Sequence, residues 1–157
     1  MTAFNELTPG TWTFDPAHSE VEFTVRHAGI SKVRGTFNEV SADLNVGESS
    51  SVTASVNVGS LDTGNADRDA HVKGADFFDT ENHPEMTFTS TSIESDGEDF
   101  TLNGDLTIKG ETRPVSFTGE FGGVAVDPFG ATRAGFSVAA SISRKEFGIT
   151  WNAALET

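Results

Sequence analysis

Residues 100–108 read FTLNGDLTI, and every second residue, from Phe100 to Ile108, is apolar or glycine. Successive side chains of a β-strand point to opposite faces, so this stretch predicts a strand with one apolar face and one polar face. Residues 115–121 read VSFTGEF and repeat the alternation after a turn signal at Gly110. The two stretches therefore predict neighbouring antiparallel strands whose apolar faces are turned towards a protein interior.

The same alternation continues through most of the chain, and segments rich in Gly, Asp and Pro separate the runs. The further predicted strands lie at residues 12–14, 20–27, 37–46, 52–58, 86–93 and 136–143. About eight strands, each apolar on a single face, predict an antiparallel sheet that closes into a barrel or folds into a sandwich. Within 37–46 the alternation of apolar and polar residues is out of step between Phe37 and Val40, which indicates a bulge or a bend.

One segment of the chain is predicted to be helical. Residues 62–65, DTGN, offer N-cap side chains, Asp67 and Asp69 suit the positive end of a helix, and Gly74 supplies a stop signal. A short helix over 66–73 therefore interrupts the strands. The length of 157 residues is close to the usual size of one domain and no linker divides the chain, so a single domain over 1–157 is expected.

The composition excludes several classes of protein. The chain has no Cys, so it holds no disulfide, no thiolate metal site and no cysteine nucleophile. Its 10 Lys and Arg stand against 24 Asp and Glu, and the resulting formal charge of -14 is poorly suited to nucleic acid. The N-terminus lacks the pattern of a signal peptide and no stretch is apolar enough to span a membrane, so a cytoplasmic protein is expected.

Phenylalanine dominates the predicted interior. Many of the 13 Phe fall on the apolar parity of the predicted strands: Phe14, Phe23, Phe37, Phe88, Phe100, Phe117, Phe121 and Phe136. An aromatic face of this kind is typical either of a fully packed core or of a barrel lumen that encloses an apolar ligand. Gly104 and Gly119, inward in mid-strand, and Phe77 and Phe78, after the predicted helix, favour the lumen modestly. Alternation alone leaves both interpretations open.

The polar residues point to no catalytic or metal chemistry. The four His lack the spacing of metal ligands, and no nucleophile elbow, phosphate loop or dinucleotide motif is present, so no metal, other cofactor or enzyme activity is expected. His27 continues the inward parity of its strand, where it would either make a hydrogen bond at the strand end or donate to a ligand head group. Arg68 lies in the polar segment 65–71, where it would either tie the helix to the barrel rim or contact a phosphate.

Several motifs, taken in order, are more specific than the alternation. They are WTFDPAHS at 12–19, VEFTVRH at 21–27, SLDTGN at 60–65 with RDAHV at 68–72, FFD at 77–79 with HP at 83–84, LTIKG at 106–110 with RPV at 113–115, and RKEFG at 144–148. With this ordered set the chain resembles the YceI-like polyisoprenoid-binding family from Gly10 to Trp151.

The resemblance implies an all-β, antiparallel, lipocalin-like eight-stranded β-barrel with one short helix near the barrel mouth. It also implies a homodimer, and an elongated apolar tunnel that binds, carries or sequesters a polyisoprenoid or other long-chain amphiphilic lipid. The head-group contacts are expected to be His27 and Arg68. The expected tunnel lining is Phe14, Phe23, Val25, Phe37, Phe77, Phe78, Phe88, Leu102, Phe117 and Phe136. The alternatives are an isomerase, cyclase or hydrolase that acts on a similar apolar substrate, and a filled structural or interaction barrel.

Overall fold

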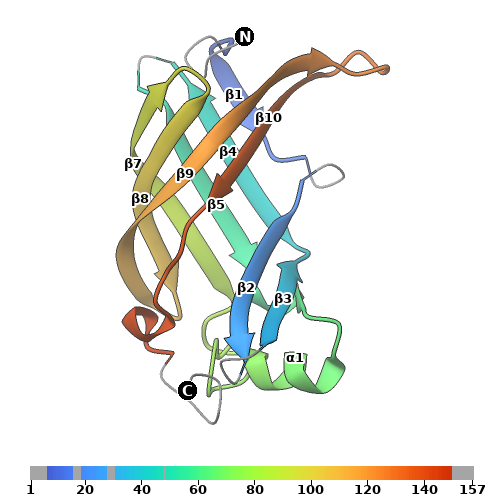
Figure 1. The fold of residues 1–157 in the computed structure, drawn as a ribbon, viewed down its shortest axis with the longest axis vertical. Coiled ribbons are helices and arrows are strands. Elements are labelled where there is room, and N and C mark those ends of the chain that lie inside the picture. Colours follow the sequence, from blue (N-terminus) through green and yellow to red (C-terminus); the bar gives the residue numbers. More distant parts are fainter. Residues whose placement is uncertain (1–6, 16–18, 28–30, 48, 150–157) are drawn as a thin grey trace.

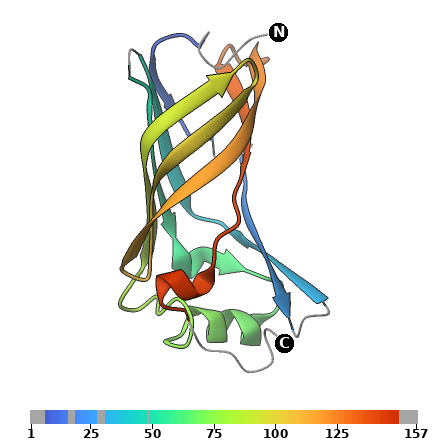
Figure 2. The same cartoon turned by 60° about the vertical axis from the view of Figure 1, so that its left-hand side comes forward.

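The computed structural model describes residues 7–15, 19–27, 31–47 and 49–149, and of Arg26, His27 and Ser31 it describes the backbone alone. Strands dominate the fold, and they curl around an elongated interior (Figures 1 and 2). The α-helix of the described residues, α1 (Ala66–Lys73), lies at one end of the curled strands, together with the short 3-10 helix η3 (Arg144–Phe147). One mouth of the interior is therefore covered by helical segments.

The described strands are β1 (Gly10–Thr13), β2 (Val21–His27), β3 (Ser31–Phe37), β4 (Val40–Val46), β5 (Ser51–Asn57), β6 (Leu61–Asp62), β7 (Glu85–Asp96), β8 (Asp99–Ile108), β9 (Glu111–Val126) and β10 (Thr132–Ala139). They form one sheet in the order β1-β4-β5-β7-β8-β9-β10 and a smaller one in the order β2-β3-β6. All described pairings are antiparallel. Within the described residues, four strands pair on one side only: β1 and β10 in the larger sheet, and β2 and β6 in the smaller one. The wall is thus a half-barrel faced by a second, smaller sheet.

The all-β antiparallel class and the short helix over 66–73 are confirmed. Eight strands have seven residues or more, although they do not match the predicted set one for one. The prediction missed β3 because Gly35, which the Phe23 ring covers, takes an inward position without an apolar side chain. The slip between Phe37 and Val40 is the bend that separates β3 from β4. β10 ends before the predicted limit at residue 143.

The core lies inside the curled sheets as two clusters of buried apolar side chains. The larger cluster contains Phe121 of β9 and Phe147 of η3, each 1% exposed. The smaller cluster includes Phe37 of β3 and lies against Val72 of α1. Because the partly buried Phe78 packs against both clusters, the apolar interior is continuous between them.

Side chains of the motif at 62–69 hold the start of α1. Asn65 is the N-cap residue, and its side-chain oxygen accepts a hydrogen bond from the backbone N–H of Arg68 at 3.0 Å. The Asp69 carboxylate accepts from the backbone N–H of Thr63 at 3.0 Å and also from the Thr63 hydroxyl. Asp69 also lies in the first turn, where a negative charge suits the helix dipole. These contacts position α1 at the mouth near the smaller cluster.

Beyond the barrel wall, β9 and β10 continue as a projecting hairpin (Figure 1). At its turn, one oxygen of the Asp127 carboxylate accepts hydrogen bonds from the backbone N–H groups of Phe129 at 2.8 Å and Ala131 at 3.0 Å. The other oxygen accepts from Nε of Arg133 at 2.7 Å, and Arg133 also pairs with Asp15. The turn is therefore closed by one carboxylate and joined to the segment that follows β1.

We expect Asp127→Ala to lower the melting temperature at pH 7 and to have less effect in acid. The hydrogen bond from Arg133 lowers the pKa of Asp127 below its ordinary 3.8, with help from the N–H groups of Ala131 and Phe129. A carboxyl whose pKa is lowered by folding stabilises the fold fully above its unfolded pKa, and this stabilisation is lost as the pH falls through the folded pKa. The difference from the parent should therefore shrink below pH 3.8.

Thermal unfolding followed by circular dichroism, at pH 7 and at about pH 2.5, measures this effect. Asp105→Ala, which removes an exposed carboxylate from β8, is the matched control and should change the melting temperature little at either pH. An equal loss of stability in the Asp127→Ala protein at both pH values would contradict a role for the ionised carboxylate.

Candidate functional site

The candidate site is the apolar interior, and phenylalanine rings on neighbouring strands form part of its wall. Phe88 of β7 and Phe117 of β9 meet edge to face, with ring centroids 5.2 Å apart. Phe136 of β10 lies 5.1 Å from Phe121 and 6.0 Å from Phe100, centroid to centroid. Aromatic pairs at such separations stabilise beyond the burial of their surface. We call these five side chains the aromatic row.

A second group of rings lies at the mouth covered by α1. The ring centroids of Phe23 on β2 and Phe37 on β3 are 5.1 Å apart. Phe78, which follows α1, meets Phe37 edge to face at 6.3 Å, and the adjacent Phe77 packs against the His71 ring at 5.1 Å. Because Phe77 and Phe78 also pack against the larger cluster, this second group is connected to the aromatic row through the core.

Two inward glycines on β8 and β9 are covered by phenylalanine rings from the neighbouring strand. A Cβ atom at Gly104 would lie 2.5 Å from the tip of the Phe88 ring. A Cβ atom at Gly119 would lie 2.5 Å from the tip of the Phe100 ring. In this structure a phenylalanine ring therefore occupies the space above each glycine, and contact of the glycines with a ligand stays a prediction.

The predicted tunnel-lining residues differ in exposure. Phe37, Phe88 and Leu102 are buried. Val25 and Phe136 are exposed, at 47% and 40%, and they lie on β2 and β10, two of the four strands that pair on one side only. The partly buried members are Phe14, Phe23, Phe77, Phe78 and Phe117. Contact of these side chains with a ligand stays a prediction.

A small hollow lies beside the second group of rings. Its volume is about 120 Å³, and its lining includes the predicted residues Phe14 and Phe37 together with Val21 and Glu20. A hydrogen bond with the Glu22 side chain, and then the charge of Glu22, raise the pKa of Glu20. Two neighbouring acidic side chains make this hollow unfavourable for an anionic group.

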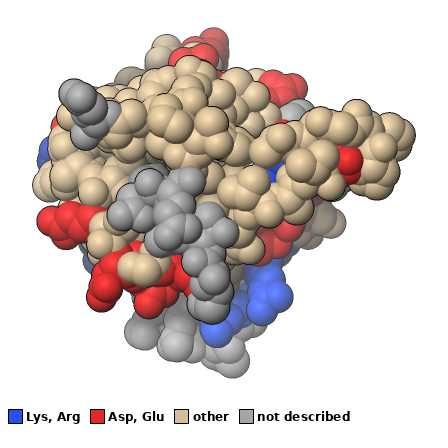
Figure 3. Space-filling view, turned by 90° about the horizontal axis from the view of Figure 1, so that it is seen from above, with Lys and Arg blue, Asp and Glu red and all other residues tan. Residues whose placement is uncertain are grey.

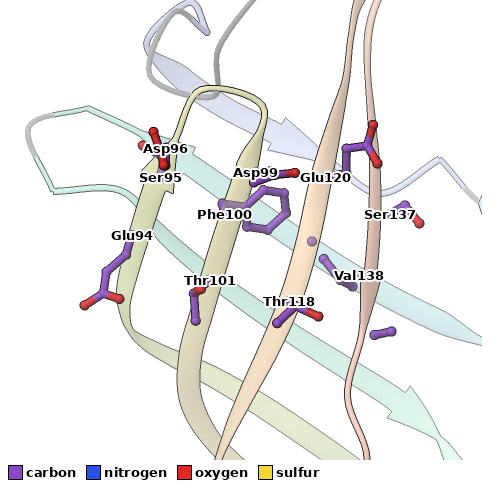
Figure 4. A pocket seen from close by; sticks show the side chains of 12 residues that line it. Glu94, Ser95, Asp96, Asp99, Phe100, Thr101, Thr118, Glu120, Ser137 and Val138 are labelled. Atoms are coloured by element: carbon purple, nitrogen blue, oxygen red, sulfur yellow. The ribbon is translucent and has the colours of Figure 1, made fainter.

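The larger hollow, of about 630 Å³, lies across β7, β8, β9 and β10 (Figure 4). Carboxylates such as Glu94 and Glu120 border it, and Thr101 and Thr118 line it. Phe100 of the aromatic row and the inward Gly119 line it as well, so the hollow adjoins the apolar wall and combines polar and apolar side chains. Sequence reasoning missed it because it depends on how the sheet curves, and no motif marks it. Within the described ranges, no three His, Cys, Asp or Glu side chains are grouped so that they could hold a metal ion.

The two predicted head-group contacts have different outcomes. The side chain of His27 lies outside the described residues, so its role stays a prediction. Arg68 donates from Nε to the Thr63 hydroxyl oxygen at 2.8 Å and from Nη2 to the Thr63 carbonyl oxygen at 2.9 Å. It therefore ties α1 to the segment after β6, which is the structural role that the sequence allowed. The helix places it near Val72, which packs on the smaller cluster.

The chemistry that the interior offers is apolar. In the described part of the chain, none of the buried side chains is polar or charged. Buried apolar surface binds a ligand through the hydrophobic effect, which has no directional requirement. The described chain also contains no helix with the length and apolarity needed to cross a membrane.

A family model and proteins of known name are similar to this sequence. The model described as a YceI-like domain matches residues 12–157. A UPF0312 protein of Staphylococcus epidermidis is 40% identical over 162 residues, which cover 100% of this chain and 88% of that protein. Protein YceI of Escherichia coli O17:K52:H18 is 39% identical over 136 residues, which cover 84% of this chain and 71% of that protein.

Solved structures have a similar fold. BcnA of Burkholderia cenocepacia has a TM-score of 0.78 at 25% identity, with 88% of this chain and 86% of that protein covered. The YCEI protein of Campylobacter jejuni has a TM-score of 0.71 at 34% identity, with coverages of 87% and 83%. A polyisoprenoid binding domain of Saccharophagus degradans, at a TM-score of 0.54 and 13% identity over 75% and 77%, is similar in fold alone. The predicted lipocalin-like barrel architecture is thereby confirmed.

Proposed function

We propose that this chain, which belongs to the YceI-like family, binds a long isoprenoid or other long-chain amphiphilic lipid in its apolar interior and carries or sequesters it. The structural neighbour from Saccharophagus degradans is described as a polyisoprenoid binding domain, which supports this class of ligand. The observation that carries the proposal is the continuous apolar interior, from the rings beside α1 to the aromatic row.

The length of the tail should dominate the choice of ligand. Burial of each CH₂ group contributes about 0.8 kcal/mol, and a polyprenyl chain offers many such groups to the phenylalanine-rich wall. The entropic cost of ordering the flexible lipid chain opposes binding and also grows with chain length. This cost cancels only part of the gain from burial. The head group should therefore orient the lipid at one mouth, and it should contribute less to the affinity than the tail does.

We propose that the lipid tail occupies positions that phenylalanine rings fill in this structure, after those rings have turned aside. Phe88 and Phe100 lie over Gly104 and Gly119, so turning either ring exposes a surface without a side chain. A side chain can change rotamer without a shift of the strand, because staggered rotamers are separate minima of one backbone conformation. The glycines would then be in contact with the tail.

Binding is supported over catalysis by the chemistry of the interior. An isomerase, cyclase or hydrolase needs an acid, base or nucleophile within reach of its buried substrate. None of the described side chains that are buried as a whole is titratable, and the buried titratable atoms are Oε1 of Glu98, between β7 and β8, and Nη2 of Arg144 in η3. The proposal is therefore a carrier that releases its ligand unchanged.

The direct test is mass spectrometry of protein purified without detergent, first intact and then after extraction with organic solvent. A stoichiometric long-chain lipid that is recovered unchanged after prolonged incubation supports the proposal. A protein that is empty and also fails to take up added polyprenols would refute it, and conversion of the lipid to a product would favour an enzyme.

The homodimer and the cytoplasmic location expected from the sequence form a further part of the proposal. Size-exclusion chromatography with light scattering measures the mass in solution, and twice the mass of one chain supports the dimer. Cell fractionation with immunodetection tests the location, and protein found outside the cytoplasmic fraction would refute it.

Arg68→Ala tests the proposed head-group contact. Arg68 stands near the covered mouth, because Val72 of the same helix packs on the smaller cluster. We expect the variant to bind a prenyl diphosphate about tenfold more weakly, the usual loss for one charge-assisted hydrogen bond, and to bind the matching prenol as before. Equilibrium binding of both lipids gives the comparison.

Lys73→Ala is the matched control, since it removes a cation from the last turn of the same helix. It should bind both lipids like the parent. Arg68→Ala also removes the two hydrogen bonds from Arg68 to Thr63. If the variant binds both lipids more weakly, and by the same factor, the loss of these bonds explains the effect. That result would restrict Arg68 to its structural role.

A further inference from the structure

The end of the β9–β10 hairpin exposes apolar side chains to an unusual degree. We call residues 124–132 the tip. Phe129 is 93% exposed and Val126 is 68% exposed, and Val124 is also exposed. The hairpin projects away from the barrel body in Figure 1, and in the view from above in Figure 3 it is seen as an almost uncharged projection. Exposed large apolar side chains that gather at one place mark an interaction surface.

The tip contains a single charged residue, Asp127, in contrast to the rest of the chain. The whole chain has a formal charge of -14, yet Asp127 and Arg133 are the charged residues of 122–135. The two are joined by the hydrogen bond from Arg133 Nε to Asp127 Oδ2 at 2.7 Å. The tip can therefore approach a neutral surface without a charge penalty, whereas an anionic surface would repel the acidic body.

The backbone N–H groups of the turn are paired within the turn. Besides the two bonds to the Asp127 carboxylate, the N–H of Asp127 donates to the carbonyl of Ala131 at 2.9 Å, and the N–H of Gly130 donates to the carbonyl of Asp127 at 3.0 Å. Pro128 has no N–H to satisfy. A segment that enters an apolar medium must pair its backbone groups internally, because each unpaired group costs several kcal/mol. The N–H groups of the turn meet this requirement.

We propose that the tip inserts into the interfacial region of a bilayer with zwitterionic head groups, and that the chain docks there to exchange its lipid. This inference rests on the proposed lipid-carrier function. Apolar side chains lie on successive positions, Val124, Ala125 and Val126, and therefore on both faces of the hairpin. A lipid environment surrounds both faces, whereas a protein partner typically adds a polar rim with directional hydrogen bonds.

The test is flotation of the full chain with vesicles of pure phosphatidylcholine on a density gradient. The bound fraction of the parent should change little between 0.1 and 0.5 M salt, since the proposed contact is uncharged. Phe129→Ser should lower the partition coefficient about tenfold, the usual consequence of losing one buried aromatic side chain. Ile142→Ser removes another exposed apolar side chain far from the tip in sequence, and should float like the parent.

The outcomes separate this inference from the proposed function. Phe129→Ser lies outside the interior, so it should retain an extracted polyprenol like the parent. A parent that holds polyprenol but does not float, or a Phe129→Ser protein that floats equally well, would overturn membrane docking alone. Flotation of a protein that holds no lipid would count against the carrier function instead. If the parent does not float and Phe129→Ser converts a dimer to a monomer, the tip is a contact between copies of the chain, and membrane docking is overturned.

Discussion

A protein with Phe117→Asp is expected to fold and to lose its lipid. Phe117 is partly buried in the aromatic row, with its ring centroid 5.2 Å from that of Phe88. A carboxylate at this position would have to leave water and face hydrocarbon, which costs several kcal/mol when the group finds no partner. We therefore expect retention of a long-chain prenol to fall at least about 100-fold, measured as lipid per protein after extraction and as affinity for added prenol.

Thr118→Asp is the matched control, because it introduces the same carboxylate one residue along β9 on the exposed, polar face. It should retain lipid like the parent. Circular dichroism establishes that both variants fold, and Phe117→Trp supplies a second, uncharged change that should shorten the longest tail retained. Full retention by a folded Phe117→Asp protein would refute the placement of the tail in the interior.

Gly104→Ala is expected to lower the free energy of unfolding by about 3 kcal/mol, at the upper end of the usual range for overpacking. The added Cβ would meet the Phe88 ring at 2.5 Å, and it would also collide with the carbonyl oxygen of Thr89. The ring can turn, but the ladder between β7 and β8 holds the carbonyl. Urea denaturation followed by circular dichroism measures the loss.

Gly47→Ala is the matched control for this change. A Cβ at Gly47 would have no atom within 4 Å, so the substitution should alter the free energy of unfolding by less than about 0.5 kcal/mol. A Gly104→Ala protein as stable as the Gly47→Ala protein would show that the β7–β8 ladder yields easily at this point.

The alternation of apolar residues was sufficient to predict an antiparallel β fold, because each strand has one face in the core and one in solvent. The motif at 62–74 was sufficient for α1, since its N-cap and its stop are local features. The prediction failed at β3, where Gly35 removes one apolar position from a short strand. Local patterns could not show that the strands divide between two sheets, because that depends on pairing between distant segments.

The candidate site was predictable in composition more than in shape. Parity placed Phe37 and Phe88 inside, where they are buried. It also placed Phe136 inside, but this side chain is 40% exposed, because its strand lies at the end of the described pairing. Parity says which face a side chain occupies, and the neighbouring strands decide how much water reaches that face. The filling of the space above Gly119 by the Phe100 ring depends likewise on cross-strand alignment.

The pairing of a glycine with a phenylalanine has a consequence for how the hairpins find their alignment. Phe100 stands directly opposite Gly119 between β8 and β9. Sliding one strand by two residues would keep both apolar faces together, but it would set Phe100 against Phe117 or Phe121, and two rings would compete for one place. A repetitive alternation otherwise offers little to reject such a slipped hairpin. Phe23 is likewise opposite Gly35 between β2 and β3, so each of these glycines selects the native alignment while the chain folds.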